Sequence, residues 1–232
     1  MDIILIPGLW LDAESWSDVL PALRDAGHRT HPVTMRGVGE PATVSADVGV
    51  RDWVDQIVAA IDGLPGDRLA LVGHSGGGNV AWAAAARRPD RVARVVLVDT
   101  VPPPPGGAIS EFPIEDGVVP FPGWDFFDDD DVHDLDDVVR ARTAPLALSV
   151  PARVPTDALD FEGDERFRVP VTLLMGAMDR DAFDAVIDEW GAYGREYRAI
   201  ESTEVVRLGT GHWPQFSAPA RLAAEVVRAI DR

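Results

Sequence analysis

Leu69-Ala70-Leu71-Val72 leads directly into Gly73-His74-Ser75-Gly76-Gly77, and residues 76–88 follow with small side chains at helical spacing. The apolar run is typical of a strand buried on both faces. The five residues after it fit the pattern G-x-S-x-G, which places a serine on a sharp turn from strand to helix. Such a turn holds the Ser75 hydroxyl clear of the sheet, close to the N-terminal amides of the helix. The pattern predicts a nucleophile, and the alternative is a Gly-rich turn with an incidental serine.

Strands and helices alternate on both sides of this turn. Further strands are expected at residues 3–6, 95–98, 171–174 and 205–208, with a weaker candidate at 31–33. Helical spacing is found at residues 14–26, 46–62, 76–88, 181–190 and 218–230. This alternation predicts an α/β fold with a mostly parallel sheet of about six strands, covered by helices on both faces.

The alternation breaks once, between about residues 101 and 168. The interruption opens on Pro102-Pro103-Pro104-Pro105, and eleven acidic residues with no Arg lie between Glu111 and Asp137. The run Asp128-Asp129-Asp130-Asp131 suggests calcium, but it lacks the glycine and the terminal glutamate of an EF-hand loop, so a solvated acidic surface is favoured. So long an interruption favours a functional lid. We therefore expect one domain, residues 1–232, with a cap insertion at about 101–168.

The composition excludes several kinds of chemistry. None of the 232 residues is Cys, so disulfides, thiolate metal sites and cysteine nucleophiles are impossible. All 21 basic residues are Arg, which excludes Schiff-base lysine chemistry. The net charge of −18 should repel nucleic acid and anionic membranes. We expect no cofactor and no metal.

The N-terminal segment gives no sign of a targeting signal. Met1 to Ile6 is apolar but lacks a basic flank and ends at Pro7-Gly8, so it is interpreted as a strand. No run approaches the length of a membrane-spanning helix. These observations favour a soluble, cytoplasmic protein.

A nucleophilic serine needs a base. His212 follows the last expected strand, at the same edge of a parallel sheet as Ser75. The other histidines lie near the weak early strand, within the serine turn or in the acidic insertion: His28, His31, His74 and His133. His212 is therefore the predicted general base.

The base in turn needs an orienting carboxylate, and three aspartates compete for this role. Asp179 follows the strand at 171–174 and is the preferred candidate. Asp99 closes the strand at 95–98 and is a genuine competitor, whereas Asp181 fits the start of a helix better. The order Ser75, Asp179, His212 is typical of the α/β-hydrolase arrangement.

The chain resembles small α/β-hydrolase-fold serine hydrolases over nearly its whole length. The motifs that carry the resemblance are Ile3-Ile4-Leu5-Ile6-Pro7-Gly8-Leu9-Trp10, Gly73-His74-Ser75-Gly76-Gly77, Gly176-Ala177-Met178-Asp179 and Gly211-His212-Trp213-Pro214. The resemblance implies an oxyanion hole made by the amides of Leu9 and Gly76. Pro7 stands where the family often has His, so the hydrogen bonds within that loop must differ.

The implied reaction is acyl transfer through an ester of Ser75, which water then hydrolyses. The substrate class is a small carboxylic ester, or a lactone or thioester. Haloalkane dehalogenases and epoxide hydrolases of this fold use an aspartate nucleophile, and plant-type hydroxynitrile lyases rely on a lysine. The resemblance therefore argues against all three activities.

Aromatic residues surround the predicted site. Trp10, Trp213 and Trp124 are candidates for lining an apolar substrate pocket, and packing in the core or cap is an equally strong interpretation. Four further tryptophans lie on expected helices and are interpreted as packing residues: Trp16, Trp53, Trp82 and Trp190. The acidic rim favours neutral or cationic esters over anionic ones.

Two other functional classes remain open. An acyltransferase would use the same three residues with an acceptor other than water, and a hydrolase-like binding protein would use the fold without chemistry. The partner is expected to be a small molecule. The sequence leaves both a monomer and a homodimer open.

Overall fold

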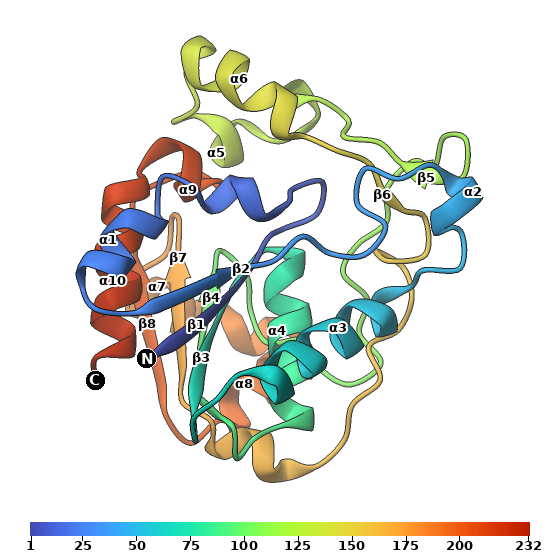
Figure 1. Cartoon of the computed structure of the whole chain (residues 1–232). Coiled ribbons are helices and arrows are strands. Elements are labelled where there is room, and N and C mark those ends of the chain that lie inside the picture. Colours follow the sequence, from blue (N-terminus) through green and yellow to red (C-terminus); the bar gives the residue numbers. More distant parts are fainter.

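The computed structural model describes residues 1–232, and its centre is a six-stranded sheet in the order β2-β1-β3-β4-β7-β8 (Figure 1). All neighbouring strands in it are parallel. The strands are β1 (Asp2–Ile6), β2 (Arg29–Pro32), β3 (Leu69–His74), β4 (Val92–Val98), β7 (Val171–Met175) and β8 (Thr203–Arg207). The predicted α/β architecture is confirmed.

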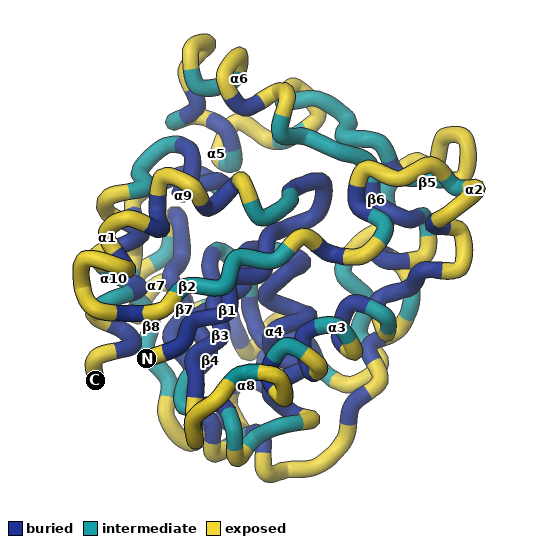
Figure 2. Tube along the Cα trace, viewed as in Figure 1, coloured by how far each residue is buried: buried dark blue, intermediate teal, exposed yellow.

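Successive residues of the strands pack alternately into two separate hydrophobic cores, one on each face of the sheet. Ile3 and Leu5 belong to the core shared with α1 (Leu20–Asp25) and α10 (Pro219–Ile230). Ile4 and Ile6 belong to the larger core on the other face, which α3 (Val50–Gly63), α4 (Gly76–Arg87) and α8 (Ala192–Ala199) cover. This period of two is what a sheet with two apolar faces requires, and Figure 2 shows the strands buried between the layers.

Two helical segments differ from expectation. Residues 14–26 form a short 3-10 helix, Ala13–Trp16, and then α1, which begins with Pro21 in its first turn. Beyond β7 the chain forms α7 (Arg180–Val186), a 3-10 helix at Ile187–Trp190, and then α8. The charged residues of α8 and its Gly194 gave it too weak an apolar pattern to be predicted.

Part of the segment between β4 and β7 lies over the end of the sheet where the parallel strands terminate, and its last residues return along the molecule to the start of β7 at the opposite end (Figure 1). It contains a small antiparallel pair, β5 (Val118–Val119) with β6 (Val150–Pro151), and two short helices, α5 (Asp129–Val132) and α6 (Asp137–Thr143). Short 3-10 helices occur at Trp124–Phe126, Ala144–Leu146 and Asp164–Arg168. Elsewhere, α2 (Ala42–Ser45) and α9 (Pro214–Ser217) are single turns. None of the helices has the length and apolar content needed to cross a bilayer.

Candidate active site

Ser75 lies on the turn between β3 and α4 with φ 50° and ψ −125°. This backbone conformation is unfavourable for a residue with a side chain and persists only where its surroundings impose it. The turn packs directly on the first strand: a Cβ on Gly77 would lie 2.2 Å from the carbonyl oxygen of Pro7. Glycine at this position therefore allows the close approach that holds Ser75 in its strained conformation.

His212 and Asp99 form a hydrogen-bonded pair at the same edge of the sheet. The Nδ1 atom of His212 lies 2.6 Å from Oδ2 of Asp99, and the two side chains are 21% and 19% exposed. Burial raises the pKa of Asp99, but the hydrogen bonds from His212 and from the Gly176 amide outweigh it and hold this pKa below its usual value. An ionised Asp99 accepts the Nδ1 hydrogen, which leaves the lone pair of His212 on Nε2.

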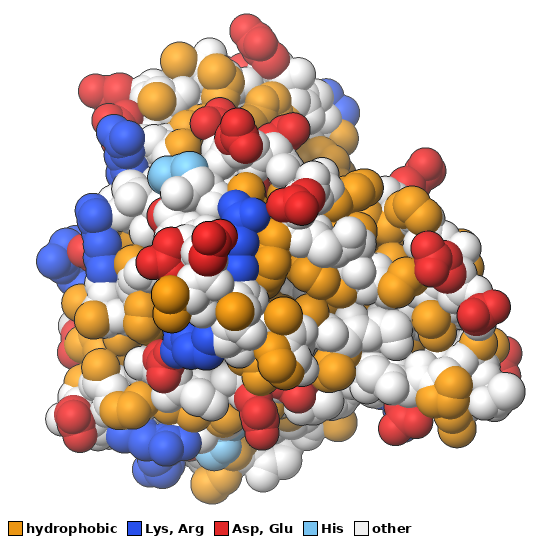
Figure 3. Space-filling model, turned by 90° about the horizontal axis from the view of Figure 1, so that it is seen from above, with side chains coloured by type: hydrophobic (Ala, Val, Ile, Leu, Met, Phe, Trp, Pro, Cys, Tyr) orange, Lys and Arg blue, Asp and Glu red, His pale blue; other side chains and the backbone are white.

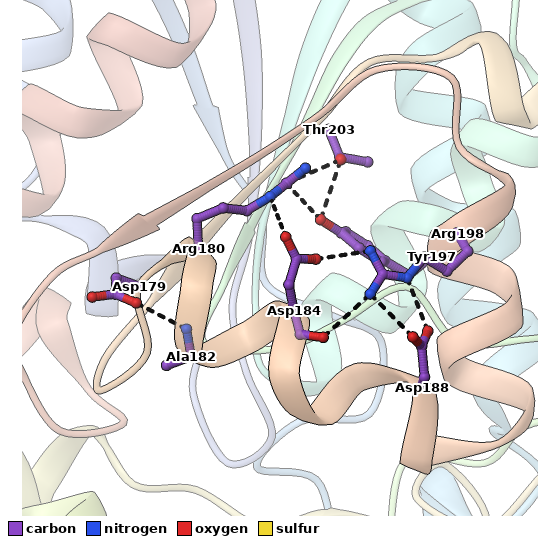
Figure 4. A network of polar contacts seen from close by, with 8 residues as sticks. All are labelled: Asp179, Arg180, Ala182, Asp184, Asp188, Tyr197, Arg198 and Thr203. Carbon is purple, nitrogen blue, oxygen red and sulfur yellow. Dashed lines mark hydrogen bonds and ion pairs between the residues drawn. The ribbon is translucent and has the colours of Figure 1, made fainter.

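Asp179, the carboxylate preferred from the sequence, does not pair with His212. It is exposed, and its Oδ1 accepts a hydrogen bond of 3.0 Å from the Ala182 amide at the start of α7 (Figure 4). Asp179 is thus the N-cap of α7, the role that the sequence suggested for Asp181. The expected pairing is corrected in favour of Asp99, whose position after β4 was the signal for it.

Gly176 explains how Asp99 reaches His212. In the sheet, β7 lies between β4, which precedes Asp99, and β8, which precedes His212. The Gly176 amide, just after β7, donates a 2.7 Å hydrogen bond to Oδ1 of Asp99. A Cβ at Gly176 would lie 2.6 Å from the Thr210 carbonyl oxygen and 3.2 Å from Asp99 Oδ1. The lack of a side chain here lets the Asp99 carboxylate and the His212 loop meet across the end of β7.

His74, next to Ser75 in the sequence, is hydrogen-bonded to the loop that carries His212. Its Nε2 lies 2.7 Å from the carbonyl oxygen of His212 and its Nδ1 lies 3.3 Å from Nε2 of Gln215. Because a carbonyl only accepts, Nε2 of His74 carries the hydrogen and Nδ1 accepts from Gln215. Burial, with a smaller contribution from the charge of His212, lowers the pKa of His74 to about 3.

This buried histidine predicts a pH dependence of stability. The unfolded chain protonates His74 near pH 6.5, whereas the folded protein does not until about pH 3. The unfolded state therefore binds more protons in this window, and the unfolding free energy falls as the pH falls through it, by at most about 1.4 kcal/mol per pH unit. Denaturant titrations from pH 7 to pH 5 measure this slope. His74→Gln should flatten it, and an identical slope in wild type and variant would refute the assignment.

Ser75, His212 and Asp99 all line one pocket of about 550 Å³, a size typical of small-molecule sites. Leu9 and Gly76, whose amides the sequence predicted for an oxyanion hole, also line this pocket. Ten of its nineteen lining residues are hydrophobic, so the pocket suits a partly apolar ligand. The remaining lining residues are His74, Trp10, Asn79, Thr100, Val101, Ile109, Ser110, Phe112, Phe126, Phe127, Asp131, Trp190, Tyr193 and Trp213.

The tryptophans separate into lining and packing residues. Trp10 and Trp213 line the pocket, which is one of the two interpretations that the sequence left open. Trp124 does not: its ring packs edge-on against Trp213, with centroids 5.0 Å apart, so it supports the wall from behind. Trp190, interpreted from the sequence as a packing residue, lines the pocket and is 39% exposed. Its 3-10 helix places it at the surface, which helical periodicity alone did not indicate.

The segment between β4 and β7 is bonded to the loop that carries His212. The His212 amide donates to the carbonyl oxygen of Asp131 at 2.8 Å, and the Gly211 amide donates to Oδ2 of Asp134 at 2.8 Å. The same segment reaches the other wall, where the Leu148 amide donates to the Trp10 carbonyl oxygen at 2.7 Å. The acidic insertion thus forms part of the site and is not a remote surface.

Comparison with known proteins assigns this chain to a family. Residues 3–225 match the model of the alpha/beta hydrolase family. The chain belongs to this family. Among solved structures, an extracellular alpha/beta-hydrolase from a Paenibacillus species aligns over 99% of this chain and 98% of its own, with a TM-score of 0.77 and 20% identity. A methylesterase, MES16 from Arabidopsis, aligns over 100% and 99%, with a TM-score of 0.74 and 20% identity. These two likenesses show the alpha/beta hydrolase fold.

Curated relatives within the alpha/beta hydrolases are similar over a shorter stretch. Esterase PIR7B of Oryza sativa subsp. japonica is 42% identical over 106 residues, 43% of this chain and 38% of its own length. A putative carbamate hydrolase, RutD of Variovorax paradoxus, is 38% identical over 98 residues, 42% of this chain and 37% of its own length. The matched part thus spans less than half the length of these curated relatives. Together the comparisons show the alpha/beta hydrolase family and its fold.

Proposed function

We propose that this protein is a serine hydrolase that cleaves a small neutral or apolar carboxylic ester, lactone or thioester through an acyl-enzyme on Ser75. The observation that carries the proposal is the His212–Asp99 pair in the pocket that Ser75 also lines. A hydrolase of this fold needs a nucleophile, a base and an orienting carboxylate. The esterases among the curated relatives support the same reaction class.

The proposed reaction has two steps. In the first, Nε2 of His212 takes the Ser75 proton while Oγ attacks the substrate carbonyl carbon, and the resulting imidazolium gives this proton to the leaving alcohol. In the second, water attacks the acyl-enzyme, again losing a proton to His212, and the acid leaves as Ser75 regains its hydrogen. Asp99 stabilises the imidazolium in both steps.

Two backbone amides support the proposed oxyanion hole. The Leu9 amide donates to no acceptor within the chain, and Gly76 is the first residue of α4, where helical amides lack intrahelical acceptors. The two residues adjoin: a Cβ on Gly76 would lie 3.1 Å from Cγ of Leu9. Unpaired amides on two residues that adjoin beside the nucleophile suit the charge that develops on the carbonyl oxygen.

In this proposal the protein is a single domain, and the insertion between β4 and β7 is a cap over its active site. It supplies aromatic side chains to the pocket wall, among them Phe112, Phe126 and Phe127. Phe112 and Phe127 pack edge-on against Trp10, with centroids 4.7 and 5.8 Å away. Such a wall excludes water from one side of the site and favours an apolar acyl or alcohol group.

A fluorophosphonate probe tests the proposal directly. The chain has no Lys, so trypsin cuts it only at Arg, and the peptide Leu69–Arg87 contains Ser75 as its sole hydroxyl side chain. We expect one adduct by intact mass, located in this peptide, together with hydrolysis of p-nitrophenyl esters whose rate depends on acyl length. Absence of an adduct on the folded protein would reject the activated serine and favour a binding role.

A further inference from the structure

Asp131 presents a carboxylate without a partner to the proposed substrate pocket. It is the last acidic residue of the Asp128–Asp131 run and lines both the main pocket and a second cavity of about 310 Å³, both of which His212 also lines. Its backbone carbonyl binds the His212 amide, but its side chain makes no hydrogen bond or ion pair. A carboxylate fixed by its backbone and left unpaired at a substrate site is available to a ligand.

The surroundings of Asp131 are negative. Burial, followed by the charges of Asp99, Asp128 and Asp130, raises its pKa, and His212 is the one neighbour that lowers it. None of the residues lining the main pocket is an Arg, and the chain has no Lys. Figure 3, which views the molecule from the side of α5 and α6, shows further acidic side chains on this face. A positive charge entering the pocket would relieve this repulsion, whereas a negative charge would increase it.

Aromatic rings share the pocket with this carboxylate. Phe127 packs edge-on against Trp213, with centroids 4.7 Å apart, and Trp213 stands at 4.8 Å from the ring of His212. Trp190 lines the same two cavities as Asp131. Aromatic faces attract ammonium groups, most strongly where water is excluded. The site therefore combines a carboxylate with the rings that typically recognise a substituted ammonium.

We propose that Asp131 selects esters that carry a positively charged group, such as a substituted ammonium, over neutral esters of the same shape. This inference rests on the proposed esterase function and changes its substrate class, because the preferred ester carries a positive charge and the neutral ester becomes the poorer substrate. The side chain acts on the ligand, because the contact of Asp131 with His212 runs through its backbone. A change from carboxylate to amide leaves that contact in place.

A pair of substrates of equal shape tests the proposal. The 2-(trimethylammonio)ethyl and 3,3-dimethylbutyl esters of one acid differ in charge and hardly in size. We expect the wild type to prefer the ammonium ester in kcat/KM, and Asp131→Asn to reduce the ratio of the two kcat/KM values about tenfold. Asp129→Asn is the matched control: Asp129 lies on the same helix, is exposed and lines neither cavity. It should keep the preference.

A binding measurement keeps this test independent of turnover. Phenyltrimethylammonium should bind the wild type and quench tryptophan fluorescence, with about tenfold weaker binding to Asp131→Asn and unchanged binding to Asp129→Asn. Equal treatment of the two esters by the wild type, or an equal loss for both in Asp131→Asn, overturns the inference. Failure to bind the ammonium probe overturns it as well. If the neutral ester is hydrolysed in such a case, the proposed function stands, and if no serine adduct forms, the function itself fails.

Discussion

Asp99→Asn should lower kcat about 10³- to 10⁴-fold with little change in KM, because the amide imposes the wrong tautomer on His212. Oδ1 of Asp99 accepts the Gly176 amide at 2.7 Å, and the variant keeps an oxygen there. Its NH₂ group then faces Nδ1 of His212, in place of the oxygen now 2.6 Å away. His212 must accept at Nδ1 and carry its hydrogen on Nε2, where it cannot take the Ser75 proton.

Asp179→Asn is the matched control for this experiment. Asn and Asp serve almost equally well as N-caps, so the bond from the Ala182 amide should persist and both stability and kcat should change little, kcat by less than about twofold. Steady-state kinetics with one ester, and thermal unfolding of both variants, measure the contrast. A large loss of activity in Asp179→Asn with an intact fold would restore the original assignment, and near-normal activity in Asp99→Asn would remove Asp99 from the mechanism.

The sheet was predictable because its determinants are local. Each central strand is a short apolar run, and its successive side chains point to opposite faces of the sheet. In β1, for example, Ile3 and Leu5 pack in one core and Ile4 and Ile6 pack in the other. The position of Ser75 could also be predicted from neighbouring residues, because the flanking glycines and the change from strand to helix are evident in the sequence. Elements with mixed composition, such as α8, depend on tertiary packing and gave no comparable signal.

The sequence limited the carboxylate that orients His212 to three aspartates. It did not identify the right one, because that depends on contacts between strands. Asp99 and Asp179 both follow parallel strands, and the sequence alone favoured Asp179. What decides between them is the space at Gly176 and the left-handed backbone of Asp99, at φ 48°. An aspartate tolerates that conformation better than most residues. Neither feature is visible before the strands are placed.

The insertion shows the same limit. Its acidity and aromatic content were evident, but the bonds of Asp131 and Asp134 to the His212 loop join residues 77 or more positions apart and follow no local pattern. Whether each tryptophan lines the pocket or packs behind its wall likewise depends on contacts in three dimensions. Trp124 packs behind the pocket wall, and Trp190 lines the pocket although the sequence suggested packing.

Ser75→Ala should abolish the fluorophosphonate adduct in the peptide Leu69–Arg87 and lower kcat/KM about 10⁵-fold, because it removes the hydroxyl that forms the acyl-enzyme. The strained backbone of Ser75 adds a second, separable result. At φ 50° and ψ −125° a Cβ is disfavoured and glycine is not. Ser75→Gly should therefore be as inactive as Ser75→Ala but more stable than it by about 1 kcal/mol.

Denaturant unfolding of the two inactive variants measures this difference without interference from activity. The comparison is matched, since both lack the hydroxyl and differ by one methyl group. A more stable Ser75→Gly would mean that the fold holds the serine in place against its own backbone preference, using the contact of Gly77 with Pro7 and the packing of α4. Equal stability would mean that the turn is relaxed in solution, so that the nucleophile would have to be positioned by its neighbours' hydrogen bonds alone.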